Sequence, residues 1–157
     1  MTAGRNTTRD FTVAVFVVSQ GKVLLHYHES LNRWLPPGGH IEPDELPDLA
    51  ALRETREETG LTVRLIGDQM NDIAADDQPV QLCRPAGVQL ERIRPGHEHI
   101  DLIYFAVPSG GDVTGSAAWF GPDSWSKLKL TDEVRIWCER AIASVDRWSS
   151  TDTRVHT

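Results

Sequence analysis

The sequence has few cysteines, no long hydrophobic run and fewer basic than acidic residues, and each shortage excludes a class of protein. The two cysteines, Cys83 and Cys138, lie far apart and give neither a disulfide framework nor the spacing of a metal site, which agrees with a reducing compartment. We expect both to be packing residues. The apolar run at residues 11–18 is too short to span a bilayer and lacks the basic start and small-residue cleavage site of a signal peptide. We therefore expect a cytoplasmic protein that does not bind membranes.

The charge balance limits the partners of the protein. Its 16 basic and 23 acidic residues give a formal net charge of -7. Such a protein repels polyphosphates unless a metal ion intervenes. The sequence also has no basic stripe and no aromatic RNA-binding motif. We therefore expect no nucleic-acid partner, and a small anionic substrate that is escorted by divalent cations.

The length of 157 residues suits one domain, and no internal repeat is visible. We expect a single domain over residues 1–148 and a polar, disordered tail at residues 149–157. Residues 12–18 and 22–28 favour β-structure and are separated by Ser-Gln-Gly, which predicts an antiparallel hairpin with Gly21 at positive φ.

Later segments predict further strands and a second helix. Strands are expected at residues 63–66 and 100–107 and at Trp119-Phe120, with Gly110-Gly111 as a turn after the second of them. Residues 67–85 have little periodicity and are expected to hold a weak strand and loops. Residues 132–148 have apolar residues at helical spacing, which predicts a packing helix. This order of elements predicts an α+β domain.

The most informative segment is residues 39–61, GHIEPDELPDLAALRETREETGL. Pro47 suits the first turn of a helix and Gly60 suits the left-handed residue that ends one, which predicts a helix over Pro47–Thr59. A glycine-rich loop at residues 34–41 precedes it, where small residues let the backbone approach a ligand closely. One stripe of the helix is expected to face the sheet: Leu46, Leu49, Ala50 and Arg53.

Three glutamates on this helix are candidate metal ligands. Glu54, Glu57 and Glu58 stand at i, i+3 and i+4 and share one face. Like charges so placed repel one another unless a cation lies among them, and hard oxygen ligands of this kind suit Mg²⁺ or Mn²⁺. The alternative, a solvated helix with Arg–Glu ion pairs, explains neither the flanking glycines nor Glu45.

The segment resembles the Nudix box, the motif of a hydrolase family that acts on nucleoside diphosphates linked to another group. The box reads Gly, five residues, Glu, seven residues, then Arg-Glu-apolar-x-Glu-Glu-x-Gly-apolar. Thr55 takes a place that is usually aliphatic. The resemblance implies an α/β/α sandwich around a mixed sheet, in which the box forms a loop, a helix and a loop. The residues in register with the motif are Gly39, Glu45, Arg53, Glu54, Glu57, Glu58, Gly60 and Leu61.

The resemblance also implies roles for these residues. Glu57 and Glu58 would be the principal metal ligands, Glu54 a further ligand or the group that orients its neighbours, and the Gly38 carbonyl another contact. Arg53 lies between the apolar stripe and the acidic face, so its guanidinium can pair with Glu54 or Glu57 and fix the rotamer of its partner. A further acid in the box, Glu45, lies near the helix start, where it can favour the helix dipole or bind metal through water.

A second concentration of polar residues lies at residues 95–101. Glu98 precedes a strand and can bind another metal ion or deprotonate a water molecule, as family members often use a carboxylate from outside the box; a surface glutamate is the alternative. If the strand is regular, His97, His99 and Asp101 share its opposite side. We expect these histidines to bind phosphate or water at the rim of the site.

Other side chains are candidates for contact with the substrate. Trp34 immediately precedes the glycine loop and can stack on a nucleobase, with core packing as the alternative. His40, inside the box, is also expected to contact substrate. His26 and His28 form a second His-x-His pair, so a zinc site between the two pairs stays open, beside the alternative of exposed strand histidines.

The leading interpretation is a Mg²⁺-dependent nucleoside triphosphate pyrophosphohydrolase. No marker for coenzyme A is visible, and residues 67–85 lack the tyrosine that the resemblance implies for some dinucleoside polyphosphate hydrolases. Pro79 and Pro85 leave an ADP-ribose-like specificity open. A Nudix-fold domain that binds nucleotides without hydrolysing them is a different class of interpretation, which the intact glutamate set argues against.

Overall fold

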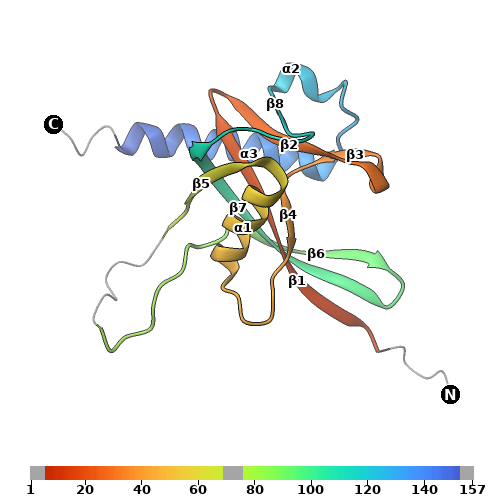
Figure 1. Ribbon diagram of the computed structural model, residues 1–157, viewed down its shortest axis with the longest axis vertical. Helices are drawn as coiled ribbons and strands as arrows, with labels where there is room; N and C mark the ends of the chain where they lie inside the picture. The colour runs from red at the N-terminus through yellow and green to blue at the C-terminus, as the bar shows by residue number, and fades with distance from the viewer. Residues whose placement is uncertain (1–5, 69–75, 153–157) are drawn as a thin grey trace.

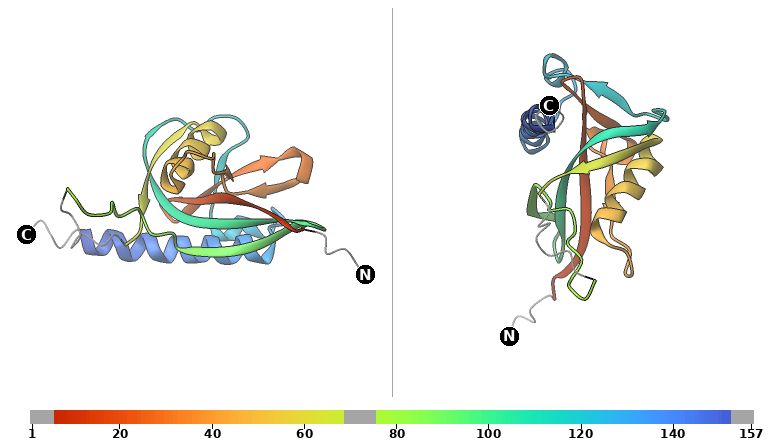
Figure 2. Two further views of the ribbon diagram at one scale, coloured as in Figure 1. Left: turned by 90° about the horizontal axis from the view of Figure 1, so that it is seen from below. Right: turned by 90° about the vertical axis from the view of Figure 1, so that its left-hand side faces the viewer.

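The computed structural model describes residues 6–68 and 76–152, and it has a mixed β-sheet between two helices. Helix α1 (Pro47–Thr59) packs on one face of the sheet and helix α3 (Asp132–Asp152) packs on the other (Figures 1 and 2). This confirms the expected α/β/α sandwich. Helix α1 has the predicted bounds, and Gly60 ends it with a φ of 80°.

The strands of the described sheet run through most of the chain. The long strand β1 lies centrally, parallel to β7 and antiparallel to β2 and β4. On the other side of β7 lie β5 and β6, and β2 also pairs with β3 and β8. The bounds are β1 (Thr8–Ser19), β2 (Lys22–His28), β3 (Arg33–Leu35), β4 (Gly38–His40), β5 (Leu61–Ile66), β6 (Gly87–Arg94), β7 (His97–Gly111) and β8 (Ala118–Phe120), with a 3-10 turn at Glu29–Leu31 and a short helix α2 (Pro122–Trp125).

The hairpin between β1 and β2 forms as the sequence predicts. Gln20 and Gly21 have φ of 51° and 71°. Two successive positive φ angles are typical of a type I′ turn, whose twist matches that of the paired strands. The hairpin thereby fixes one end of β1, the strand from which the site is built.

Several elements differ from the expectations. Gly110 and Gly111 belong to β7, where they pair with Thr62 and Leu61 of β5, and so do not form a turn. Strands β3, β4 and β6 were not predicted. Within the described parts of residues 67–85, which omit 69–75, the expected weak strand is absent. Helix α3 continues through Ser149–Asp152, where a disordered tail was expected, and residues 153–157 lie outside the described part.

The buried face of α1 also differs from the predicted stripe, because Leu46 and Leu49 are about half exposed. Ala50 is buried as predicted, and Ala51, Thr55 and Thr59 are buried with it. Small side chains let the helix backbone lie close to the sheet. The hydroxyls of Thr55 and Thr59 donate to the carbonyls of Ala51 and Thr55 at 2.8 and 2.6 Å, so burying them leaves no donor unsatisfied.

The second core, beneath α3, is built from apolar residues on the opposite face of the sheet. Val134, Cys138, Ala141 and Val145 of α3 are buried there. Burial raises the pKa of Cys138 to about 12, which keeps the thiol protonated. In the described part of the chain, no helix combines the length and the apolar character needed to cross a membrane.

Candidate active site

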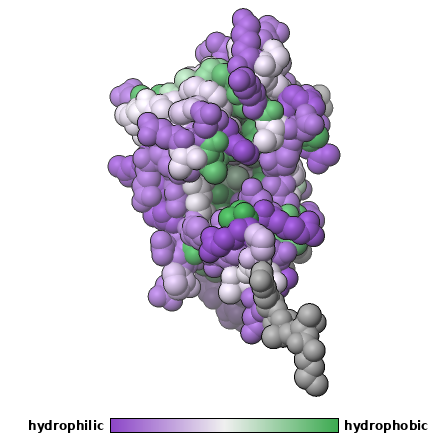
Figure 3. Space-filling model, turned by 90° about the vertical axis from the view of Figure 1, so that its right-hand side faces the viewer, coloured by the Kyte–Doolittle hydropathy of each residue, from purple (hydrophilic) through white to green (hydrophobic). Residues whose placement is uncertain are grey.

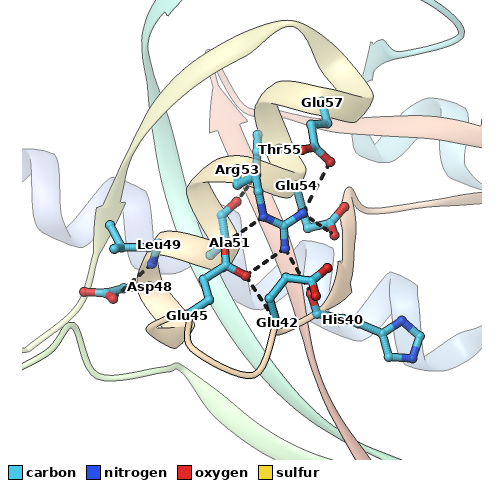
Figure 4. Close-up of polar contacts among 10 residues, drawn as sticks. All are labelled: His40, Glu42, Glu45, Asp48, Leu49, Ala51, Arg53, Glu54, Thr55 and Glu57. Carbon is cyan, nitrogen blue, oxygen red and sulfur yellow. Dashed lines mark hydrogen bonds and ion pairs between the residues drawn. The ribbon is translucent and has the colours of Figure 1, made fainter.

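Arg53 is the centre of the polar contacts around α1 (Figure 4). Its Nε and Nη2 donate to the two carboxylate oxygens of Glu45 at 2.7 and 2.8 Å, a bidentate pair. Its Nη1 donates to Glu54 at 2.8 Å and to Glu57 at 3.3 Å. The pairing with Glu54 and Glu57 agrees with the prediction, whereas the bidentate partner Glu45 was not assigned to Arg53. One guanidinium thus orients three carboxylates.

Glu45 is held by its own loop as well. Its carboxylate accepts a hydrogen bond from the Glu42 N–H at 3.1 Å, and the Glu45 N–H donates to the Glu42 carbonyl at 3.0 Å. Hydrogen bonding to Arg53 is the main reason that the pKa of Glu45 lies below its usual value. Because Arg53 also donates to the His40 carbonyl at 3.0 Å, it ties the helix to the loop that precedes it.

The two glycines before the helix lie in close contact with their neighbours. A Cβ on Gly39 would lie 2.5 Å from a carboxylate oxygen of Glu54, and a Cβ on Gly38 would lie 2.1 Å from the Val13 carbonyl of β1. The Gly38 N–H donates to Glu58 at 3.0 Å. The glycine loop therefore lies directly against two of the three candidate ligands.

The box carries more negative than positive charge. Burial raises the pKa of Glu54, Arg53 lowers it, and the neighbouring Glu58 and Glu57 raise it further. Carboxylate oxygens are the donor set that suits Mg²⁺ or Mn²⁺. The residues present therefore fit a divalent cation. The contact with the Gly38 carbonyl stays a prediction.

A cleft of about 330 Å³ lies beside the box, on the side of the sheet that α3 covers. The face of the molecule in Figure 3 is hollowed, with hydrophobic side chains in the hollow and hydrophilic ones around it. Glu58, Gly38 and Gly39 line the cleft together with residues of β6, β7 and α3. The polar residues lining the cleft include His26, His28, His40, Glu58, Gln89, Glu91, His99, Asp101 and Glu133.

Two carboxylates in this cleft have raised proton affinity. Asp101 is 7% exposed, and the Thr12 hydroxyl donates to it at 2.9 Å. Burial, together with the nearby Glu91 and Glu133, raises the pKa of Asp101 to about 6. Burial also raises the pKa of Glu91, and Glu133 adds to this shift. Both are candidates for acid–base chemistry. Glu91 is an alternative to Glu98 as the base on sequence grounds, but its place beside Asp101 was not predicted because β6 was not predicted.

Glu98 and Trp34 lie outside the set of residues that line the cleft. Strand alternation places Glu98 on the opposite face of β7 from His99 and Asp101, and its carboxylate accepts from Arg9 of β1 at 2.9 Å. The ring of Trp34 packs against those of Tyr27 and Phe120, with centroids 5.5 and 4.8 Å away. Trp34 thus contributes to an aromatic cluster, and stacking on a nucleobase stays untested.

The remaining predicted histidines gather around Asp10 of β1. The Nε2 atoms of His40 and His97 each lie 3.4 Å from the same oxygen of Asp10. The ring of His99 lies between them, 5.0 Å from that of His40 and 5.1 Å from that of His97. Burial lowers the pKa of His99, and His40 and His97 lower it further.

The other His-x-His pair takes no part in this group. His26 Nε2 lies 3.0 Å from a carboxylate oxygen of Glu58. His28 Nδ1 accepts from the Leu31 N–H at 3.3 Å. A zinc site shared between the two His-x-His pairs is therefore not formed, and His26 acts with the box instead.

Comparisons with known proteins agree with this arrangement. The NUDIX domain model matches residues 8–143. The m7GpppN-mRNA hydrolase NUDT17 of Bos taurus is 30% identical over 144 residues, covering 79% of this chain and 45% of that protein. The asymmetrical bis(5'-nucleosyl)-tetraphosphatase of Mus musculus is 49% identical over 39 residues, covering 25% of this chain and 26% of that protein. The chain thus spans less than half the length of these two relatives.

The solved structures extend the likeness to nearly the whole domain. A hydrolase of the NUDIX family from Clostridium perfringens is 29% identical, with a TM-score of 0.77 over 88% of this chain and 99% of that chain. The Ap4A hydrolase of C. elegans has a TM-score of 0.59 at 18% identity, covering 88% of this chain and 98% of that one, which shows a shared fold alone.

Proposed function

Because this chain belongs to the Nudix hydrolase family, we propose that it performs Mg²⁺-dependent hydrolysis of a phosphoanhydride bond in a nucleoside diphosphate derivative, with a nucleoside triphosphate as the first candidate substrate. The observation that carries the proposal is the set of box carboxylates that Arg53 and Gly38 hold beside a cleft. The cleft is of the size that suits a small molecule, for which pockets start at about 300 Å³.

The box residues would hold the cation and keep its ligands in place. Glu54, Glu57 and Glu58 are the proposed ligands of Mg²⁺, for which Mn²⁺ can substitute. When bound, the cation neutralises phosphate charge and lowers the pKa of a bound water molecule. Arg53 limits the rotamers of Glu54 and Glu57, while the Gly38 N–H and His26 position Glu58.

Residues that line the cleft are proposed to contact the rest of the substrate. The apolar lining of the cleft, which includes Phe16 and Leu35, suits a nucleobase, while His40 and His99 are proposed to contact phosphate oxygens, directly or through an ion that they bind. Glu98 stays the proton acceptor predicted from the sequence. Asp101 is the alternative that the cleft supports, because it lines the cleft and burial raises its pKa to about 6.

A second candidate class of substrate follows from the relatives. The cap hydrolase match covers 79% of this chain, so capped RNA is a candidate despite the net charge of -7. The tetraphosphatase match covers 39 residues, and it supports a dinucleoside polyphosphate only as a test compound. ADP-ribose is the remaining alternative substrate.

The experiment is a turnover screen with Mg²⁺ that separates released products by chromatography. Its substrates are nucleoside triphosphates, nucleotide sugars, ADP-ribose, dinucleoside polyphosphates and capped RNA. Release of a nucleoside monophosphate and pyrophosphate would establish the first candidate. Tight binding of a nucleotide without turnover would instead identify a non-catalytic binding domain.

Two variants make the screen specific to the box. Glu57→Gln removes a proposed ligand, and Glu139→Gln is the matched control. Each glutamate pairs with an arginine four residues earlier in a helix, and their side chains are 59% and 52% exposed. Turnover must depend on Mg²⁺, fall in the first variant and persist in the second. Equal turnover in all three proteins would refute the proposal.

A further inference from the structure

We propose that Asp10, His40, His97 and His99 form a binding site for Zn²⁺ or a similar transition-metal ion, separate from the glutamates of the box. The four residues come from three adjacent strands: His40 from β4, Asp10 from β1, and His97 and His99 from β7. Strand register brings them together, because His40 lies opposite Thr12 of β1 while His99 lies opposite Asp10. Alternation then places all four side chains on one face of the sheet.

Two contacts within the group have a length that suits tetrahedral coordination. One oxygen of Asp10 lies 3.4 Å from His97 Nε2 and 3.4 Å from His40 Nε2. Hydrogen bonds between nitrogen and oxygen are usually about 2.7–3.2 Å long. Ligand atoms that lie about 2.0–2.1 Å from a tetrahedral zinc ion are about 3.3 Å from one another. The two contacts therefore have the length of an edge of a zinc tetrahedron.

Three of the four residues already lie close together, because ligand atoms of Asp10, His97 and His99 are all within 4.8 Å of one another. His40 joins them through its contact with Asp10 at 3.4 Å. The His99 ring is 5.0 Å from that of His40. The His99 ring therefore lies within reach of the same ion as the other three side chains.

The Thr8 hydroxyl is an outer partner of His97. Its oxygen lies 2.9 Å from His97 Nδ1 and 3.3 Å from the Gly96 carbonyl oxygen. In the tautomer with the proton on Nδ1, Thr8 accepts from His97, and Nε2, the atom that faces Asp10, offers its lone pair to a metal ion. An outer partner of this kind is the usual companion of a metal-bound histidine.

The ligand chemistry separates this site from the box. Three imidazoles and one carboxylate suit Zn²⁺, Co²⁺, Ni²⁺ or Cu²⁺, whereas a set of carboxylates suits Mg²⁺ or Mn²⁺. The side chains of Asp10 and His40 are about half exposed, which gives an ion access from solvent. The side chain of His97 is 13% exposed and anchors the group in the sheet.

His40 connects this site to the box. Its carbonyl oxygen accepts from Arg53, while its ring points away from Arg53 (Figure 4). A metal ion bound to the ring would cross-link β4 to β1 and β7. It would thereby restrain the strand that contains Gly38 and Gly39.

The test uses the full chain after chelation has removed bound transition metals. The buffer contains excess Mg²⁺, so that the box glutamates have the cation proposed for them. Co²⁺ is titrated first, because tetrahedral Co²⁺ has intense visible absorption bands, and Zn²⁺ is then added to displace it. We expect one equivalent of tetrahedral Co²⁺, displacement by Zn²⁺, and a higher melting temperature with Zn²⁺ than with chelator. Absence of the tetrahedral bands in the wild-type protein would overturn the proposal.

Variants assign the site to these residues. Asp10→Asn and His97→Ala should each weaken Co²⁺ binding by at least about 10–100-fold, which is the loss seen when even an outer partner of a ligand is removed. Asp10→Asn keeps the shape of a half-exposed side chain, so it decides the matter if His97→Ala does not fold. Unchanged affinity in Asp10→Asn would overturn the proposal.

Two controls separate this site from the rest of the cleft. Glu57→Gln removes a box glutamate, and His28→Ala removes a histidine that lines the cleft outside the group. Both should retain the Co²⁺ bands, and loss of the bands in either would assign the ion elsewhere. Because the readout is metal binding, failure of the substrate screen would leave this test unaffected.

Discussion

Replacing Asp101 by asparagine should stabilise the protein at neutral and alkaline pH. Asp101 is buried in the cleft wall, where Glu91 and Glu133 add negative potential, while the Thr12 hydroxyl, which donates at 2.9 Å, and the Gln89 side chain partly offset it. Asparagine has nearly the same shape, and its carbonyl oxygen can accept the same hydrogen bond. The substitution therefore removes the buried charge and keeps the packing.

The size and sign of the effect follow from the pKa. Burial raises the pKa of Asp101 from 3.8 to about 6. At about 1.4 kcal/mol per pKa unit, ionised Asp101 costs the folded state about 3 kcal/mol as an upper value. Because the pKa is higher in the folded state, the folded protein binds the proton more tightly, and this stability is lost as pH rises through about 6. Asp101→Asn does not undergo that loss. Its free energy of unfolding should therefore exceed that of the wild type by the full amount at about pH 8 and by very little at about pH 4.

The assay is urea denaturation of both proteins at the two pH values, in chelator so that bound metal does not contribute. Asp146→Asn, at an exposed position of α3, is the matched control and should change the free energy of unfolding little at either pH. The reasoning would be refuted if Asp101→Asn and wild type differed by the same amount at both pH values, or if wild type were the more stable at the higher pH.

Three further variants test the box and its surroundings. Glu57→Gln should remove most turnover while the free energy of unfolding holds or rises modestly, because it deletes a ligand charge and relieves repulsion; full activity would contradict this. Arg53→Lys loses the bidentate pair with Glu45, so turnover should fall and metal affinity should weaken by about 10–100-fold, with Arg135→Lys as the control. An unchanged metal titration would count against a positioning role. Glu98→Gln should lower kcat by about two to four orders of magnitude with substrate binding retained, if this residue is the base. An unaltered pH–rate profile would leave Glu98 as a partner of Arg9 and move the role to Asp101.

The elements that were predicted well have strong local signals. Helix α1 has the predicted bounds because Pro47 and Gly60 mark its two ends through their own backbone preferences. The β1–β2 hairpin formed for the same kind of reason, since Gly21 tolerates a positive φ. The spacing of the box glutamates likewise placed them on one helical face without knowledge of the tertiary structure.

The features that were missed depend on contacts between distant segments. Val88 and Leu90 of β6 are exposed, so the apolar residues of this strand do not mark a buried face and the strand is defined by its pairing with β7. The buried face of α1 was misjudged because small residues, and not its leucines, meet the sheet. The group around Asp10 depends on the parallel register of β1 and β7, which local sequence does not encode.

The same parallel pairing determines when the site can form during folding. Thr12 and Asp101, whose side chains meet in the cleft, lie 89 residues apart in the chain. Closing so long a loop costs entropy before native contacts can offset it, so pairings of this kind form slowly. A chain emerging from the ribosome therefore carries the whole box long before β7 exists to complete the cleft. A chain truncated before β7 would keep the whole motif in its sequence but could not form the cleft.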